Sequence, residues 1–252
     1  TIKQKVLAEL EGHVNDDTVI CSNTSSLSIS QMGEAMQHPE RFAGLHFFNP
    51  VNRMPLVEII AGKKTSPETL STLVTLVRKV GKNGVVVKDC PGFLVNRLLI
   101  PYLLEAGHLL EAGGTLEQID RTMEDFGMPM GPFRLIDEVG IDVGYKVSKC
   151  LEEAYSDRMR VPSCFSGCLE QELLGKKNGK GFYIYRGKKA TLNRDIRGVA
   201  STGKGAISPQ AIIARCMGVM VNEAARCLEE EVISSAEYLD MAMILGTGFP
   251  PF

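Results

Sequence analysis

An internal repeat is the feature of this sequence that most restricts its fold. The matched segments keep one order along the chain: Asn96-Arg97 with Ala214-Arg215, Glu105-Ala106 with Glu223-Ala224, Leu110-Glu111 with Leu228-Glu229, Asp120 with Asp240, and Gly131-Pro132-Phe133 with Pro250-Pro251-Phe252. The first three pairs of segments share one constant spacing. Self-similarity of this kind indicates two copies of one structural unit.

The repeated unit has the apolar spacing of helices. One long helical face is marked by Val95, Leu98, Leu99, Tyr102, Leu103, Ala106, Leu109 and Leu110. Shorter helical patterns cover residues 117–126 and 143–155. We therefore predict a first helical domain over residues 89–186, a polar linker over residues 187–209, and an incomplete second helical unit over residues 210–252.

The part of the chain before the repeat alternates between helix and strand patterns. The expected elements are a helix over residues 1–11, strands at 18–21, 45–48, 56–60 and 85–87, and a helix that begins after Thr65 or Ser66. This order predicts that residues 1–88 form the second half of an α/β sheet domain. The predicted fold class is therefore α/β followed by all-α.

Composition excludes several classes of partner. The 252 residues carry a formal net charge of -2, which argues against a nucleic-acid backbone as the main partner. No apolar run reaches the roughly 18 residues that a membrane span needs, so we expect no transmembrane segment. The seven cysteines lack paired C-x-x-C spacing, which favours reduced thiols in a cytosol-like compartment and no metal site.

Two residues in the strand patterns are candidates for acid–base chemistry. His46 stands at the end of an apolar run beside a loop, where open α/β sheets bind their ligands. Glu58 lies inside another apolar run, and a buried carboxylate needs a partner. If the two strands are neighbours, Glu58 can orient His46 and stabilise its imidazolium. The alternative is a structural Glu58 that pairs with Arg53 at the end of the sheet.

Polar residues elsewhere in the sequence add to these candidates. Ser22-Asn23-Thr24-Ser25-Ser26 follows a strand pattern, where it can contact a ligand or cap the next helix. Asn96 corresponds to Ala214 in the second repeat, although the neighbouring arginine is kept. The side-chain amide of Asn96 is therefore either functional or a local helix cap. No G-x-G-x-x-G motif follows a strand, so a dinucleotide phosphate loop is missing from this chain.

Four segments together resemble the L-3-hydroxyacyl-CoA dehydrogenase family. They are Ser22 to Ser26, Phe42-Ala43-Gly44-Leu45-His46-Phe47-Phe48-Asn49-Pro50, Pro55-Leu56-Val57-Glu58-Ile59-Ile60, and Asp89-Cys90-Pro91-Gly92-Phe93-Leu94-Val95-Asn96-Arg97. The resemblance extends over nearly the whole chain. It implies that residues 1–88 are the C-terminal half of a Rossmann-like NAD-binding domain, followed by two copies of the family's helical C-terminal unit.

The resemblance also implies a role for each site residue. In this interpretation His46 is the general base that takes the proton of the substrate 3-hydroxyl, and Glu58 orients it. Ser25 and Asn96 are expected to hold the oxygens of the acyl-CoA thioester substrate. Lys3, Ser25 and Asn49 match positions that contact NAD in the family, and Lys177 matches a further lysine assigned to the cofactor in some members.

Two helical copies resemble the large multifunctional fatty-acid-oxidation subunits, and the likeness of Asn52-Arg53-Met54-Pro55-Leu56 and of Asn222 to Glu229 favours the bacterial type. The resemblance implies β-oxidation, an enoyl-CoA hydratase region in the parent protein, and a thiolase subunit as partner. We expect a cytoplasmic location in a bacterium, or a mitochondrial or peroxisomal one in a eukaryote. We also expect a fragment, truncated at both ends, that is inactive without the upstream phosphate-binding loop.

Two other functions remain open at this point. The chain could be a non-catalytic helical docking module of a β-oxidation complex, whose apolar faces bind partner subunits. It could also be a related dehydrogenase of free 3-hydroxyacids, although such an enzyme would be expected to use a lysine where this chain has His46 and Glu58.

Overall fold

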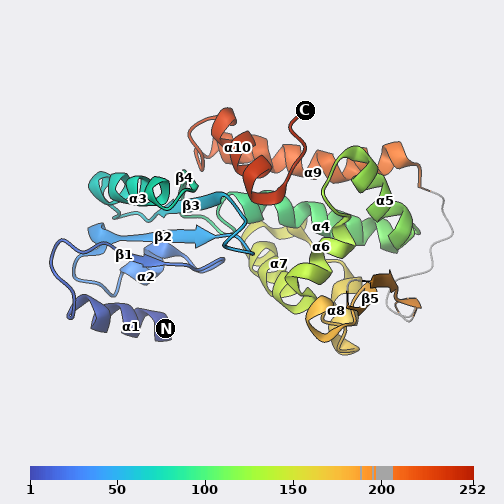
Figure 1. Ribbon diagram of the computed structural model, residues 1–252, viewed down its shortest axis with the longest axis horizontal. Helices are drawn as coiled ribbons and strands as arrows, with labels where there is room; N and C mark the ends of the chain where they lie inside the picture. Colours follow the sequence, from blue (N-terminus) through green and yellow to red (C-terminus); the bar gives the residue numbers. More distant parts are fainter. Residues whose placement is uncertain (188, 195, 197–206) are drawn as a thin grey trace. The chain divides into compact units, whose positions relative to one another are not determined.

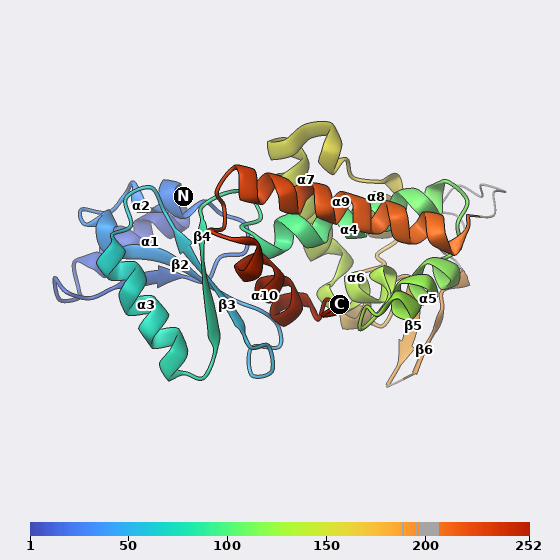
Figure 2. The same cartoon turned by 90° about the horizontal axis from the view of Figure 1, so that it is seen from above.

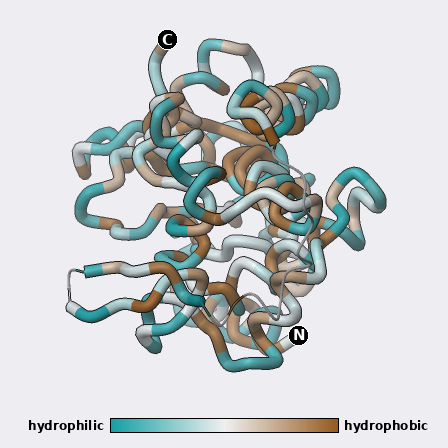
Figure 3. The backbone as a smooth tube through the Cα atoms, turned by 90° about the vertical axis from the view of Figure 1, so that its right-hand side faces the viewer, coloured by the Kyte–Doolittle hydropathy of each residue, from teal (hydrophilic) through white to brown (hydrophobic). Residues whose placement is uncertain are grey.

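The computed structural model describes residues 1–187, 189–194, 196 and 207–252. The chain divides into two compact units, each described by itself below. Unit 1 consists of Thr1–Asn96 and Ala225–Gly248, and unit 2 of Arg97–Ala224 and Phe249–Phe252. Apolar and hydrophilic stretches alternate along the helical segments in Figure 3, as expected for helices that bury one face.

Unit 1 is built on a four-stranded mixed sheet. Its strands are β1 (Ile20–Ser22), β2 (Phe42–Phe47), β3 (Leu56–Ala61) and β4 (Asn83–Lys88), which neighbour each other in chain order. β1 pairs with β2 and β3 pairs with β4 in parallel, whereas β2 and β3 are antiparallel. The predicted α/β domain is thus confirmed, and its four predicted strands all form.

Helices cover both faces of this sheet (Figure 1). On one face α3 (Pro67–Lys79) packs Leu73 and Val77 against Ala43, Val57 and Ile59 in the core. The Ser66 hydroxyl, one of the two predicted caps, caps α3 by accepting from the Thr69 amide. The opposite face is covered by α2 (Ile29–Gly33), since a Cβ built on Gly44 in β2 would meet both Ile29 and Ile60.

Unit 1 also contains α1, a short 3-10 turn and a helix from the second repeat. α1 (Ile2–Glu11) begins with a capping box between Thr1 and Gln4 and contacts α2. A 3-10 turn, η1 (Pro39–Arg41), leads into β2. From the second repeat, α10 (Ala236–Thr247) packs on β3, where Gly246 comes close to Leu56.

Unit 2 is mainly helical. Its elements are α4 (Val95–Glu111), which begins in unit 1, α5 (Leu116–Phe126), α6 (Pro132–Val139), α7 (Ile141–Tyr155), η2 (Ser156–Met159), α8 (Ser163–Glu170), η3 (Lys176–Asn178), β5 (Tyr183–Arg186), β6 (Lys189–Leu192) and α9 (Pro209–Glu229), which ends in unit 1. The all-α prediction is confirmed for this part, with a small antiparallel hairpin of β5 and β6 added.

Two features of the units differ from the linear domain prediction. Part of the expected linker, Lys189–Leu192, forms β6 and pairs with β5. Residues 225–248 of the expected second helical unit belong to unit 1, because α10 packs on its sheet. The predicted boundaries at residues 88, 186 and 209 otherwise stay predictions.

In unit 2 the two copies of the repeat are joined by two equivalent ion pairs, each between the arginine of one copy and the glutamate of the other. α4 and α9 are corresponding helices of the two copies and lie side by side in both views (Figures 1 and 2). Arg97 Nε of the first copy binds Glu223 Oε2 of the second at 3.1 Å, and Arg215 of the second copy pairs with Glu105 of the first. Such an exchange of equivalent contacts is the signature of a two-fold relation.

A buried carboxylate joins three elements of unit 2. Asp120 in α5 accepts the Phe133 amide of α6 at 2.8 Å and the Tyr183 hydroxyl of β5 at 2.8 Å. A Cβ on Gly131 would come within 2.2 Å of the Asp120 side chain, so glycine is required there. Burial raises the pKa of Asp120 to about 7 because desolvation outweighs these hydrogen bonds.

Three further features bear on the sequence predictions. None of the helices in the described parts of the chain is both long and apolar enough to cross a membrane. Within those same parts, no group of three or more His, Cys, Asp or Glu side chains is arranged to hold a metal ion. None of the seven cysteines, all of which are described, forms a disulfide bond.

Candidate active site

His46 and Glu58 face each other directly across β2 and β3. The antiparallel register pairs their backbones, and both side chains point to the face that α2 covers. His46 Nδ1 lies 2.7 Å from Glu58 Oε2, and the two residues are only 5% and 0% exposed. An imidazole that donates from Nδ1 to a carboxylate leaves the lone pair on Nε2.

The other nitrogen of His46 faces a hydroxyl from the segment that follows the neighbouring strand. His46 Nε2 lies 3.1 Å from the Oγ of Ser25, which follows β1. Because β1 and β2 are parallel, their carboxyl ends meet at one edge of the sheet, where α/β domains bind ligands. Asn23 Oδ1 accepts the Phe47 amide at 3.0 Å and ties the segment after β1 to β2.

Of the seven site residues that the resemblance implies, the structure brings four together. Asn96, in the first turn of α4, donates from Nδ2 to the Ser25 carbonyl at 3.4 Å, so it joins Ser25, His46 and Glu58. Lys3 on α1 and Asn49 after β2 are both exposed. Among the described residues neither makes a hydrogen bond or ion pair with the other four, so their assignment to NAD stays a prediction.

The second oxygen of Glu58 binds backbone groups that sequence reasoning missed. Glu58 Oε1 accepts the Leu94 amide at 3.1 Å and the Val95 amide at 2.9 Å, both at the start of α4. With Oε2 bound by His46, both oxygens of this buried carboxylate have donors. The alternative pairing with Arg53 is not observed, since the partners of Glu58 are these three groups.

Two aromatic rings, also missed, enclose the imidazole. The ring centroid of Phe48 lies 4.7 Å from that of His46, and the Phe93 ring meets it edge-on at 5.8 Å. Phe93 is only 1% exposed. The rings shield the His46–Glu58 pair from water, so Nε2 is the polar atom of His46 that remains available to a ligand. A base in this setting can take a proton from a hydroxyl group placed beside Ser25.

Two family models match consecutive parts of the chain. Residues 1–90 match the NAD-binding domain of 3-hydroxyacyl-CoA dehydrogenase, and residues 92–185 match the C-terminal domain of the same family. Together they cover more than half of the chain. The chain belongs to the 3-hydroxyacyl-CoA dehydrogenase family. The resemblance predicted from sequence is confirmed, and with it NAD as the family's cofactor.

Individual relatives agree with this family. The fatty acid oxidation complex subunit alpha of Psychrobacter cryohalolentis is 47% identical over the whole chain, which covers 36% of that protein. A crystal structure of 3-hydroxybutyryl-CoA dehydrogenase from Escherichia coli K12 superimposes with a TM-score of 0.87 at 26% identity, covering 99% of this chain and 70% of that one.

Another crystal structure, of (S)-3-hydroxybutyryl-CoA dehydrogenase from Ralstonia eutropha, has a TM-score of 0.71 at 37% identity. That match covers 73% of this chain and 66% of the other. The chain spans only about 36% of the length of the curated relatives that it matches first. These relatives are bacterial.

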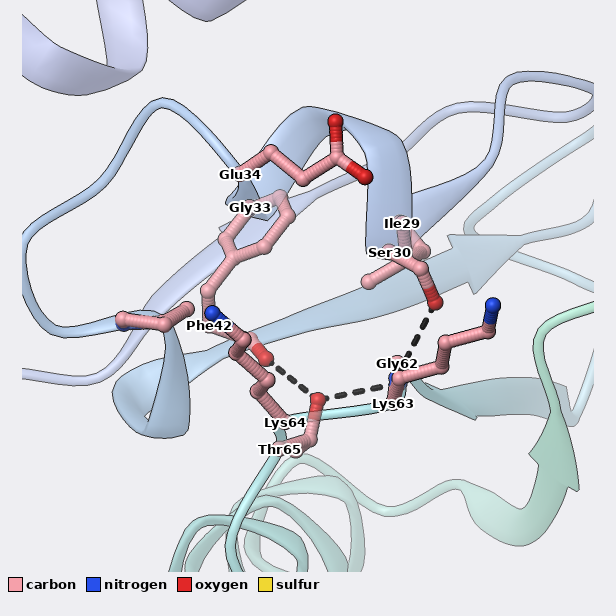
Figure 4. A pocket seen from close by; sticks show the side chains of 10 residues that line it. Ile29, Ser30, Gly33, Glu34, Phe42, Gly62, Lys63, Lys64 and Thr65 are labelled. Carbon is pink, nitrogen blue, oxygen red and sulfur yellow. Dashed lines mark hydrogen bonds between the residues drawn. The ribbon is translucent and has the colours of Figure 1, made fainter.

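The pocket of this dehydrogenase-family chain shown in Figure 4 is not the candidate active site. It lies between α2, the beginning of β2 and the loop after β3, where Thr65 Oγ1 donates to the Phe42 carbonyl and accepts the Gly62 amide. No predicted site residue lines it. Phe42 is at the opposite end of β2 from His46, so this pocket cannot serve the His46–Glu58 pair.

The sheet edge at Ser25 fits a nucleotide cofactor of the family's kind. Ser25 and Asn49 each follow one of two parallel strands, and both are exposed and therefore accessible to a ligand. Their hydroxyl and amide groups can bind ribose and carboxamide oxygens and nitrogens. Lys177, the remaining cofactor candidate, lies in unit 2 and forms an ion pair with Asp142.

Proposed function

We propose that this chain carries the catalytic residues for oxidation of an L-3-hydroxyacyl-CoA to the 3-ketoacyl-CoA with NAD. The observation that supports the proposal is the buried His46–Glu58 pair, whose free Nε2 faces Ser25 at 3.1 Å. Membership of the 3-hydroxyacyl-CoA dehydrogenase family supports the reaction class, and the geometry of the pair supports His46 as the base that the reaction needs.

In the proposed reaction His46 Nε2 accepts the proton of the substrate 3-hydroxyl. The C3–H bond breaks at the same time, its electron pair leaves as hydride, and the C3–O bond becomes a carbonyl. NAD supplies the hydride acceptor. Glu58 keeps the Nδ1 proton of His46 in place, so Nε2 starts as a free base and the imidazolium that forms is stabilised by the adjacent carboxylate.

Other site residues are proposed to bind rather than to move protons. The Ser25 hydroxyl and the Asn96 amide would hold the 3-oxygen and the thioester oxygen of the substrate. Lys3, Ser25 and Asn49 would contact NAD, as their match to the family implies. Ser25 thus has two proposed tasks. Its hydroxyl lies beside the proposed base His46, and Ser25 follows β1 at the edge of the sheet where NAD is proposed to bind.

The biological setting is also a proposal. Relatives named fatty acid oxidation complex subunit alpha support a role in bacterial β-oxidation, in the cytoplasm, with a thiolase subunit as partner. The parent protein would also carry an enoyl-CoA hydratase. Because this chain has no G-x-G-x-x-G loop after a strand, we propose that the 252 residues alone are inactive and that turnover needs the upstream part of the domain.

The decisive experiment follows NADH formation from an L-3-hydroxyacyl-CoA by the full-length protein and by its His46→Gln variant. The expected result is a loss of turnover in the variant of about a hundredfold or more, while NAD titration gives the same Kd for both proteins. Equal turnover of the two proteins contradicts the base assignment. Absence of turnover in the unmodified protein contradicts the proposed reaction itself.

One observation favours a second candidate, the docking module. α1 exposes an apolar stripe of Ile2, Val6 and Leu10, with exposed fractions of 83%, 55% and 41%. Such a stripe is typical of a helix that is covered by another part of a protein. This candidate needs no base, so it predicts that His46→Gln changes neither assembly nor any measured rate.

A further inference from the structure

The start of α4 holds Glu58 in an arrangement that depends on an unusual backbone. The chain leaves β4, passes through Cys90-Pro91-Gly92-Phe93, and presents the Leu94 and Val95 amides to Glu58 Oε1 at 3.1 and 2.9 Å. To do so it turns through two consecutive left-handed residues, Gly92 with φ 79° and Phe93 with φ 51°. Glycine adopts such angles freely, but phenylalanine does not.

The turn is held by contacts at its start and by a hydrogen bond inside it. At its start the Asp89 carboxylate accepts the Ser28 hydroxyl and the Ser30 amide, each at 2.7 Å, which ties the turn to α2. Inside the turn the Phe93 amide donates to the Cys90 carbonyl at 2.9 Å. The left-handed geometry is therefore held by its surroundings, which is the condition under which a strained residue persists in a folded protein.

A glycine at position 93 would meet the backbone requirement without strain, so the side chain must have another use. The Phe93 ring is 1% exposed and meets the His46 ring edge-on at 5.8 Å. The amides of the two residues that follow Phe93 bind Glu58, the partner of His46. One residue thus supplies both the turn that aims the amides at Glu58 and the ring that closes the pair off from water. Strain at a residue in contact with a candidate base is evidence for function.

We propose that Phe93 is a positioning residue of the His46–Glu58 pair. Its backbone directs the Leu94 and Val95 amides onto Glu58, and its ring fixes the imidazole plane, so that Nε2 keeps its direction toward the substrate hydroxyl. Phe93 touches neither substrate nor cofactor in this proposal, which rests on the proposed dehydrogenase function. A change at Phe93 should therefore lower kcat more than it raises KM.

The test compares Phe93→Ala and Phe93→Gly in the full-length protein, with Phe42→Ala as the matched control. Phe42 is equally buried at 1% and lies in the same β2 strand as His46, but at its other end. Both variants remove the ring, but the glycine variant keeps the left-handed turn accessible without steric cost, so comparison of the two separates the loss of the ring from backbone strain. Amide hydrogen exchange at Leu94 and Val95 is measured beside kcat and KM.

The expected result for both Phe93 variants is faster exchange of the two amides and a kcat reduced about tenfold or more, with KM for acyl-CoA and NAD changed less than about threefold. Phe42→Ala should leave this local exchange and kcat unchanged. Wild-type exchange and kcat in Phe93→Gly, or equal losses in Phe42→Ala, overturn the proposal. Because exchange needs no turnover, an inactive wild-type protein would reject the proposed reaction and leave the positioning claim to be decided by the exchange rates.

Discussion

The two carboxylate oxygens of Glu58 bind different partners, Oε2 the His46 ring and Oε1 two backbone amides. Replacement of Glu58 by glutamine therefore affects the two contacts differently. The glutamine carbonyl can still accept the Leu94 and Val95 amides, as Glu58 Oε1 does. Its amide group would then donate toward His46 Nδ1, the atom that Glu58 Oε2 binds at 2.7 Å. The preferred tautomer of His46 would be reversed, with the proton on Nε2 and no lone pair left for the substrate.

We therefore expect Glu58→Gln to fold normally but to lose kcat by about a hundredfold to ten-thousandfold. Steady-state NADH formation measures the loss, and the Kd for NAD should stay within about threefold as the control. A Glu58→Gln protein that keeps its kcat would show that Glu58 serves only to cap α4.

Asn96 allows a prediction in which the repeat itself supplies the control. Its counterpart in the second copy is Ala214, so a helix of this kind tolerates alanine at the position. Asn96→Ala should therefore leave the thermal midpoint unchanged or slightly raised, since alanine is the better helix former. Loss of one hydrogen bond to the substrate should reduce kcat/KM about tenfold. Unaltered kcat/KM together with a lower thermal midpoint would instead identify Asn96 as a structural helix residue.

At the scale of elements, Asp120 makes the junction of α5, α6 and β5 sensitive to pH. The pKa of Asp120 in the folded protein is raised to about 7 from 3.8, with desolvation as the largest cause. Between these values the folded state holds a proton that the unfolded state has released. This contribution therefore stabilises the fold most at acid pH and declines as pH rises from about 4 to about 7.

Asp120→Asn removes this titration and keeps an acceptor for the Phe133 amide. Relative to the unmodified protein, we expect the variant to gain a few kcal/mol in free energy of unfolding between pH 4 and pH 8, since one pKa unit corresponds to about 1.4 kcal/mol. Urea unfolding of both proteins across this pH range measures the difference. A difference that shrinks as pH rises would mean that hydrogen bonds to the ionised carboxylate outweigh its burial.

The same elements show which parts of the fold the sequence can predict. Long periodic patterns, such as residues 95–110, and a capping signal, such as Ser66, were sufficient because they depend on neighbours along the chain. One acid in an apolar strand showed that Glu58 needs a buried partner, but it left His46 and Arg53 both open, and the structure decides for His46. The backbone amides that bind Glu58 cannot be recognised from the sequence, because every residue except proline has one. The left-handed conformation of Phe93 is set by tertiary contacts, which a local sequence pattern does not predict.

At the scale of the whole molecule, duplication explains residues that the active site does not. The repeat preserves an arginine and a glutamate in each copy, and in unit 2 each arginine pairs with the glutamate of the other copy. The two pairs are not equivalent in their surroundings. Around Arg97 and Glu223 the side chains are 0% and 5% exposed, whereas Arg215 and Glu105 are 43% and 15% exposed.

The buried Arg97–Glu223 pair also makes further contacts with charged and aromatic side chains. Glu223 Oε1 binds Arg158 Nε at 2.7 Å, and the guanidinium groups of Arg97 and Arg158 lie 4.5 and 4.7 Å from the centre of the Tyr155 ring. A buried charge that loses a partner is costly, whereas an exposed pair contributes little. The two copies of one contact should therefore differ in their importance for stability.

We expect Arg97→Leu to lower the free energy of unfolding by about 3 kcal/mol, and Arg215→Leu, its matched control in the second copy, by less than about 1 kcal/mol. Urea unfolding at low and high salt measures both, and only the small Arg215 effect should diminish with salt because exposed charges are screened. Equal losses would mean that the two copies are held by a symmetric pair of contacts. The expected inequality would instead show that duplication was followed by specialisation, with the Arg97–Glu223 contact as the main electrostatic link between the two copies.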